Sequence, residues 1–172
     1  QLFYNADGTM KLVTCTKSGL PQLGGNTPTP GPTPTPPPTG SYVRFRNVAT
    51  SLYIDGMGST GNGSNACQYS SSSSNNQQWQ IISSGSYVMI KNRATGLYLD
   101  GMGRTSNGSI CGQWASSGSN NQQWTQESVG SYVKLKNRAT GLYLDGMGST
   151  ANGSNLCQYS SSSSTNQQWQ KQ

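Results

Sequence analysis

Three consecutive segments of the 172-residue chain repeat one pattern every 45 residues, and each contains short alternating stretches but no apolar stripe at helical spacing. Four strands of about five residues cannot bury a core alone, but three such units can if they close around a pseudo-threefold axis. A small propeller needs about four blades, and an open solenoid needs atypical capping repeats. The sequence therefore predicts an all-β fold, a β-trefoil over residues 41–172.

The repeat is defined by three landmarks that recur without insertion or deletion. Each unit opens with Tyr-Val, continues with Leu-Tyr-x-Asp-Gly-Met-Gly and closes with Asn-Gln-Gln-Trp. The closing residues Trp79, Trp124 and Trp169 are expected in the core, because a chain with so few apolar residues should bury its largest apolar side chains. They should pack with other apolar residues, which in the first unit are Val43, Leu52 and Ile54.

Four stretches of the first unit have the composition of strands, and glycine-rich or serine-rich segments separate them. Glycine supplies the positive φ that tight turns need. The expected strands span residues 42–47, 52–55, 66–70 and 78–82. The same stretches recur in the other two units, so twelve short strands are expected.

The residues before the repeats have a different composition. Residues 24–40 alternate proline with threonine, which predicts an extended, polyproline-like linker without a core. Residues 1–23 contain strand-like stretches around Asp7-Gly8 but are too short to form a domain. They are expected to be the C-terminal remnant of an upstream domain in a longer protein.

The formal net charge is +6, but the lysines and arginines are spread singly along the chain. Only the position of Arg46, Lys91 and Lys136 is basic in all three units. Proteins that track phosphates concentrate their positive charge, so no nucleic-acid partner is expected. The sequence also has no run of about 18 apolar residues, so no membrane span is expected.

The four cysteines, Cys15, Cys67, Cys111 and Cys157, follow the repeat rather than forming local pairs. There is no CxxC pair and no histidine, so the sequence predicts neither a disulfide framework nor a metal site. Buried or half-buried free thiols are expected instead, and no cofactor.

Acidic residues are few in the repeats: Asp55, Asp100, Asp145 and Glu127. The three aspartates are related by the axis and should lie far apart, whereas glycoside hydrolysis needs two carboxylates about 5 to 10 Å apart. Without histidine a nucleophile–base triad is missing, and no glycine-rich phosphate loop leads into a helix. The sequence predicts a binding module rather than an enzyme.

The Gln-x-Trp that closes each unit, with Leu-Tyr-x-Asp-Gly upstream, resembles the ricin B-type lectins and carbohydrate-binding module family 13. This resemblance covers residues 41–172. Residues 1–23, with Tyr-Asn-Ala-Asp-Gly-Thr-Met, resemble the C-terminal end of a family 43 glycoside hydrolase. Together the two resemblances imply a sugar-binding module attached to a hydrolase.

The lectin resemblance implies one shallow sugar site in each unit. A carboxylate accepts charge-assisted hydrogen bonds from sugar hydroxyls, an aromatic ring stacks on the C–H face of the sugar, and amides complete the site. Capping of its own turn is the structural alternative for an aspartate followed by glycine. Carried over by position, the three sites are Asp55, Tyr69, Asn76 and Gln77, then Asp100, Trp114, Asn121 and Gln122, then Asp145, Tyr159, Asn166 and Gln167.

The chain departs from the family pattern in three ways. Tyrosines replace the first cysteine of a disulfide that the family often has in each repeat, so those bridges are not expected. A glutamine two residues before the stacking ring is also replaced, which weakens the site or passes the role to the next glutamine. The turn after the aspartate is one residue shorter. The residues that replace the glutamine before the ring are Cys67, Gly112 and Cys157, and the glutamines that follow them are Gln68, Gln113 and Gln158.

The expected function is multivalent binding that keeps an attached hydrolase near plant cell-wall polysaccharide such as xylan, arabinan, arabinoxylan or galactan. The protein is expected to be a monomer, secreted by a bacterium, with the polysaccharide and an upstream catalytic domain as partners. The Asn-Gly-Ser sequences at Asn62, Asn107 and Asn152 are then turns rather than glycosylation sites. A protein-binding trefoil, as in inhibitors or cytokines, and a spacer without a ligand are the alternatives.

Overall fold

The computed structural model describes residues 40–172, so the expected remnant over 1–23 and nearly all of the expected linker over 24–40 lie outside the described residues. Within 40–172 the chain consists of short strands, turns and three single-turn 3-10 helices. In this part of the chain no helix is long and apolar enough to cross a membrane, and no group of three His, Cys, Asp or Glu side chains is placed to hold a metal ion.

All four strands expected in the first repeat are present. The first of them is divided at Arg44, because the chain there changes its partner from the end of the first repeat to the end of the third. A 3-10 helix, η1 (Asn75–Gln77), precedes the last strand. The strands of this repeat are β1 (Tyr42–Val43), β2 (Phe45–Asn47), β3 (Tyr53–Asp55), β4 (Ser64–Asn65), β5 (Cys67–Tyr69) and β6 (Trp79–Ser84).

The second and third repeats have the same order of elements. The second contains β7 (Tyr87–Asn92), β8 (Tyr98–Asp100), β9 (Ser109–Ile110), β10 (Gly112–Trp114), η2 (Asn120–Gln122) and β11 (Trp124–Val129). The third contains β12 (Tyr132–Asn137), β13 (Tyr143–Asp145), β14 (Ser154–Asn155), β15 (Cys157–Tyr159), η3 (Thr165–Gln167) and β16 (Trp169–Lys171).

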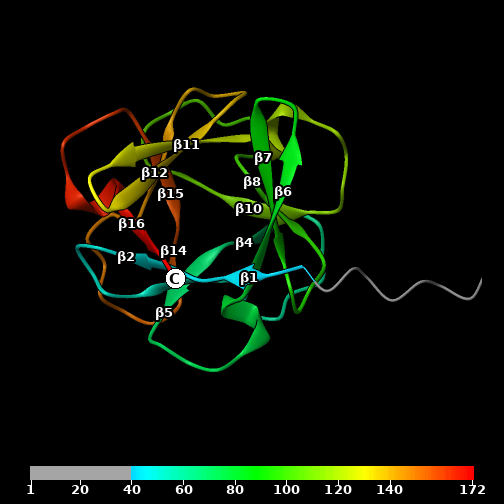
Figure 1. Cartoon of the computed structure of the whole chain (residues 1–172), viewed down its shortest axis with the longest axis horizontal. Helices are drawn as coiled ribbons and strands as arrows, with labels where there is room; N and C mark the ends of the chain where they lie inside the picture. The colour runs from blue at the N-terminus through cyan, green and yellow to red at the C-terminus, as the bar shows by residue number, and fades with distance from the viewer. Residues whose placement is uncertain (1–39) are drawn as a thin grey trace, which may run out of the picture. The chain divides into compact units, whose positions relative to one another are not determined.

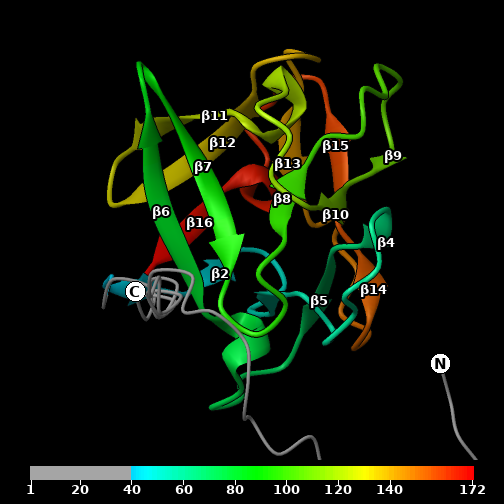
Figure 2. The same ribbon diagram turned by 90° about the vertical axis from the view of Figure 1, so that its right-hand side faces the viewer.

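The described residues form sixteen strands rather than twelve. Besides the division at Arg44, each repeat adds one two-residue strand: β4, β9 and β14. These short strands pair with β10, β15 and β5 of a neighbouring repeat (Figure 2). Their sequences are too short to show an alternating pattern, and their partner lies in another unit, so sequence periodicity could not reveal them.

Antiparallel pairing joins the three repeats in a closed cycle. The hairpin β6–β7 links the first repeat to the second, β11–β12 links the second to the third, and β16 pairs with β2 to link the third to the first. The repeats consequently lie around a common centre (Figure 1). This closure confirms the pseudo-threefold β-trefoil.

The three closing tryptophans form the centre of the core, as expected. Each is fully buried, and its indole N–H donates to a backbone carbonyl oxygen of its own repeat, as Trp79 does to Ile54 at 3.1 Å. Ile54 is also fully buried, Leu52 is buried, and Val43 packs against the core from its edge. The other fully buried members are Phe45, Ala66, Ile90, Leu99, Cys111, Leu135, Leu144 and Leu156.

The cysteines of the described part are free and buried, which confirms the expectation for Cys67, Cys111 and Cys157. Burial raises the pKa of all three thiols, and nearby carboxylates such as Asp55 beside Cys67 raise it further. They therefore behave as small apolar side chains rather than as reactive thiolates. Cys15 lies outside the described residues.

Buried amides connect each repeat to the Asp-Gly turn and to the 3-10 helix of its neighbour. Gln113 Nε2 donates to the carbonyl oxygen of Gly56 at 3.0 Å, and Asn92 Nδ2 donates to the carbonyl oxygen of Asn76 at 2.8 Å. The glutamines that precede the stacking rings therefore point into the molecule and hold the turn, rather than pointing into a sugar site. The equivalent pairs are Gln158 with Gly101, Gln68 with Gly146, Asn137 with Asn121, and Asn47 with Asn166.

This contact leaves no room for a side chain at the glycine. A Cβ on Gly101 would lie 2.8 Å from both Gln158 Oε1 and Asn137 Cγ. We expect Gly101→Ala to lower the free energy of unfolding by about 1 to 3 kcal/mol, because the buried amides must shift. Urea unfolding measures the change. Gly61→Ala, where no atom lies within 4 Å of the added Cβ, should change stability by less than about 0.5 kcal/mol. Equal effects of the two substitutions would contradict the packing account.

Candidate functional site

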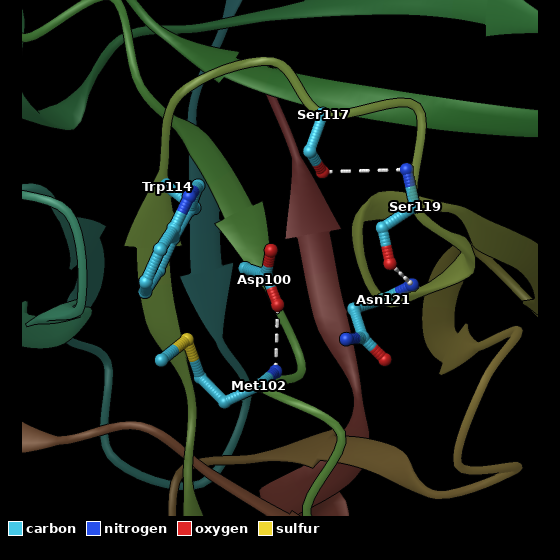
Figure 3. A pocket seen from close by; sticks show the side chains of 6 residues that line it. All are labelled: Asp100, Met102, Trp114, Ser117, Ser119 and Asn121. Carbon is cyan, nitrogen blue, oxygen red and sulfur yellow. Dashed lines mark hydrogen bonds between the residues drawn. The ribbon is translucent and has the colours of Figure 1, made fainter.

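Each repeat carries one open surface pocket, and the same six positions line all three. The pockets have volumes of about 310, 310 and 300 Å³ in the first, second and third repeats. Figure 3 shows the second, where the Trp114 ring and the Asn121 amide lie on opposite sides of the Asp100 carboxylate. The positions are those of Asp55, Met57, Tyr69, Ser72, Ser74 and Asn76 in the first repeat.

The aspartate at the end of β8 both caps a turn and lines the pocket. Asp100 Oδ1 accepts a hydrogen bond from the backbone N–H of Met102 at 2.6 Å, so the capping alternative is correct as far as it goes. Asp55 and Asp145 make the same bond at 2.7 Å. Each residue is 5% exposed, and each lines its pocket. The turn therefore fixes the carboxylate beside the pocket.

Aromatic rings at the ends of β5, β10 and β15 form the opposite wall. Tyr69, Trp114 and Tyr159 are 38%, 38% and 39% exposed, which confirms that they face solvent. Successive side chains of a strand point to opposite faces, so the inward direction of Gln68 sends Tyr69 outward. Asp55 on β3 pairs with Cys67 on β5, and Tyr69 follows two residues later on the same strand. The ring and the carboxylate therefore come from adjacent strands.

The serine-rich loop before each 3-10 helix is ordered by hydrogen bonds rather than being a simple connection. In the first repeat Ser72 Oγ accepts from the Ser74 N–H at 3.3 Å, and Ser74 Oγ accepts from the Asn76 N–H at 3.1 Å. Ser74 thereby caps η1 and presents Asn76 to the pocket. The loop serines line the pocket, so the interpretation of the serine run as a loop missed part of the site.

The glutamine after each of these asparagines is placed differently from the other predicted site residues. Gln77, Gln122 and Gln167 are fully buried, and none of them lines a pocket. Gln77 Nε2 donates to Asp55 Oδ2 at 3.0 Å and to the Ser70 carbonyl oxygen at 2.8 Å, while its Oε1 accepts from the Ser72 N–H at 3.0 Å. In the first repeat, Gln77 therefore holds both the Asp55 carboxylate and the serine loop from the interior side.

Besides the loop serines, two further kinds of residue in or beside the pockets were missed in the sequence. The first is the methionine between two glycines, which lines every pocket; Met57 and Met147 are among the most exposed apolar residues of the described part. Its backbone has a positive φ of 53° at Met57, which is uncommon for a residue other than glycine. The recurrence of Gly-Met-Gly in each unit was the available signal.

The second kind is the asparagine of each Asn-Gly-Ser turn. Asn62 Oδ1 accepts from the backbone N–H of Ala115 at 2.8 Å, directly after the ring of the next repeat. Asn107 binds Ser160 and Asn152 binds Ser70 in the same way. These residues are in turns, as expected, and they also position the chain beside the ring of a neighbouring pocket. Each pocket is therefore built by two repeats.

The pKa of the Asp100 carboxyl is raised by its surroundings. Burial raises its pKa above the ordinary value, and this effect outweighs the hydrogen bond from the Met102 N–H and the Gln122 side chain, which lower the pKa. The charge of the Asp100 carboxylate is less well solvated than that of a surface carboxylate.

The raised pKa gives a pH dependence of stability with a definite sign. The folded state binds the proton more tightly than the unfolded state, so the stabilising contribution is complete below the unfolded pKa and is lost as the pH rises through the folded pKa. We expect wild type to lose stability relative to Asp100→Asn as the pH rises from about 3 to 7. Urea unfolding of both proteins across this range measures the difference. A difference that is constant, or that changes in favour of wild type, would contradict the burial account.

Comparisons with known proteins agree with the geometry. The family model of the ricin-type β-trefoil lectin domain matches three overlapping stretches, residues 35–114, 75–159 and 120–172. No sequence among the curated proteins matches the chain. A designed threefold-symmetric protein, ThreeFoil, is similar with a TM-score of 0.73 and 36% identity, over 76% of this chain and 96% of that one.

Two natural proteins of known structure are also similar. An exo-β-1,3-galactanase from Clostridium thermocellum has a TM-score of 0.74 and 29% identity over 78% of this chain, which spans only 30% of the galactanase. A Macrolepiota procera ricin B-like lectin, solved with lactose, has a TM-score of 0.68 and 20% identity over 80% of this chain and 98% of the lectin. The second likeness shows the fold alone.

The matching family model describes a lectin domain, a type of binding module, in agreement with the expectation from the sequence. The family match spans all three repeats, and the fold, the closing tryptophans and the repeated pockets fit it. The chain belongs to the ricin-type β-trefoil lectin family.

Proposed function

We propose that the chain binds saccharides in its three pockets and thereby holds an attached glycoside hydrolase on plant cell-wall polysaccharide. The observation that carries this proposal is the threefold recurrence of a carboxylate, an exposed ring and an amide around a hollow of about 300 Å³. A protein-binding trefoil that uses one irregular loop would not need the same pocket in every repeat.

The pocket groups match the two faces of a sugar. Hydroxyls can donate to the aspartate, whose carboxylate offers acceptors only, and the side-chain amide of Asn76 or its counterpart offers both donors and acceptors. The C–H face can stack on the exposed ring. The pockets are shallow and open, so each site alone should bind with a Kd of roughly millimolar to tens of micromolar.

Three weak sites on one chain gain from a repetitive ligand. When one pocket is occupied, the others meet the next sugars of the same polymer at high effective concentration. The repeats lie around a common centre (Figure 1). Since each repeat carries one pocket, the three pockets can engage separate segments of polysaccharide. Such binding suits retention on a cell wall better than capture of a free monosaccharide.

The cell-wall assignment rests on the residues before the trefoil and on one relative. Residues 24–40 have the composition of a linker, and residues 1–23 resemble the end of a family 43 glycoside hydrolase. In the C. thermocellum galactanase, the part similar to this chain spans less than a third of that protein. We therefore propose xylan, arabinan, arabinoxylan or galactan as the polymer and a bacterial, extracellular setting.

Removal of the three rings tests the proposal. We expect Tyr69→Ala, Trp114→Ala and Tyr159→Ala, combined in one protein, to abolish retardation in native gels that contain xylan, arabinan, arabinoxylan or galactan. The rings are exposed, so the variant should keep its fold, which circular dichroism checks. Val129→Ala, which truncates an exposed apolar side chain of the β11–β12 hairpin outside the pockets, is the matched control and should migrate as wild type.

The aspartates give a second arm of the same test. Asp→Asn at positions 55, 100 and 145 is preferable to Asp→Ala, because Asn Oδ1 can still accept from the turn N–H that the aspartate now binds. The triple variant should also lose retardation, since the charge-assisted acceptor is gone. Unchanged retardation of both triple variants would reject the pockets as the binding sites. Binding of a protein but of no polysaccharide would favour the alternative class.

A further inference from the structure

The second pocket differs from the other two in two residues, at positions 114 and 112, and in the burial of Met102. Trp114 stands in place of Tyr69 and Tyr159, and Gly112 stands in place of a cysteine. Met102 is half-buried, whereas Met57 and Met147 are 43% and 44% exposed. The rest of the pocket wall is the same in kind, so these three residues distinguish the second pocket.

Gly112 makes room for the methionine. A Cβ at this position would lie 2.8 Å from Met102 Sδ and 3.1 Å from its Cγ. In the first and third repeats the buried side chains of Cys67 and Cys157 occupy the corresponding space. The Met102 thioether therefore lies in the volume that the cysteine side chain fills in the first and third repeats.

The retreat of Met102 accommodates the indole. A Cβ on Gly63, in the turn contributed by the first repeat, would lie 3.5 Å from Trp114 Cζ3 and 3.9 Å from Met102 Cε. The indole edge and the thioether consequently both lie beside this turn. At the equivalent turns, an added Cβ on Gly153 would meet only Met57 Cε at 4.0 Å, and one on Gly108 would meet nothing within 4 Å.

The exchange enlarges the stacking wall without closing the pocket. The second pocket has a volume of about 310 Å³, equal to that of the first, although its ring is the larger one. Trp114 and Tyr69 are exposed to the same fraction, 38%, and that fraction of an indole is a greater area than that of a phenol. The wider ring therefore adds apolar surface where a sugar would stack.

We propose that Gly112 is a positioning residue that makes the second pocket the tightest of the three saccharide sites. This inference rests on the proposed function, because it ranks the same pockets. Gly112 acts through Met102 and Trp114 and does not line the pocket itself. The three sites of this chain are therefore unequal, with one anchoring site and two weaker ones that act by avidity.

Single-site proteins test the ranking by calorimetric titration with xylobiose, arabinobiose and galactobiose. Tyr69→Ala with Tyr159→Ala leaves only the second pocket, and Trp114→Ala with Tyr159→Ala leaves only the first. We expect the second-pocket protein to bind the same disaccharide roughly threefold to tenfold more tightly, given the usual worth of extra aromatic contact. Equal affinities, or tighter binding by the first-pocket protein, would overturn the inference while leaving the proposed function intact.

A swap at Gly112 separates its role from that of the ring. Gly112→Cys in the second-pocket protein should displace Met102 and lower the affinity by a similar factor, although Trp114 is unchanged. The first and third repeats already carry cysteine on this strand, so the fold should be kept, and thermal unfolding verifies it. Conversely, Cys67→Gly with Tyr69→Trp should raise the affinity of the first-pocket protein, and Tyr69→Trp alone should raise it less.

The outcomes distinguish the two proposals. No effect of Gly112→Cys would overturn the role of Gly112. Absence of heat from wild type with all three disaccharides, together with absence of retardation by the four polysaccharides, would overturn the proposed function and this inference with it.

Discussion

Each candidate site depends on a backbone contact made by the neighbouring repeat. The Gln113 amide binds the Asp-Gly turn that carries Asp55, and the Asn92 amide binds the adjacent carbonyl oxygen of Asn76. The glycine of the turn is required because a Cβ would collide with both amides. Buried amides of this kind are costly unless they are fully hydrogen-bonded. Closure of the three repeats satisfies them, so the turn that carries each aspartate depends on the neighbouring repeat for its support.

The same strands connect stability to ligand recognition. In the three-residue strand β5, Gln68 points inward to the turn of another repeat, while Tyr69 points outward to its own pocket. A neighbouring asparagine, Asn152, then fixes the backbone after the ring. Strand alternation thus places a structural amide and a stacking surface on successive residues, and a change of register would exchange them. A strand of three residues can therefore contribute both to the interior and to a pocket.

Much of this organisation could be predicted from the sequence because the information was local and repeated three times. The interval between Asp55, Asp100 and Asp145 indicated the symmetry, and the closing tryptophans indicated the core. The contributions that could not be predicted come from other repeats. The partners of β4, the direction of Gln68 and the role of Asn62 depend on residues far away in the sequence, where periodicity carries no information.

Burial also decided between roles that composition could not separate. Gln77 and Asn76 have the same chemistry and adjoin in sequence, yet the glutamine is fully buried beneath the carboxylate and the asparagine lines the pocket. Met57 was overlooked because an apolar residue in a turn suggests no polar chemistry, although a methionine beside a ring is a suitable apolar contact.

The central claim is that these pockets, and not another surface, receive a saccharide. Its most direct test is a crystal structure of the chain with xylobiose, arabinobiose or galactobiose at saturating concentration. The account predicts a sugar ring stacked on Tyr69, Trp114 or Tyr159, with hydroxyls donating to the aspartate of the same pocket. A disaccharide bound elsewhere on the trefoil, with the three pockets empty, would contradict it.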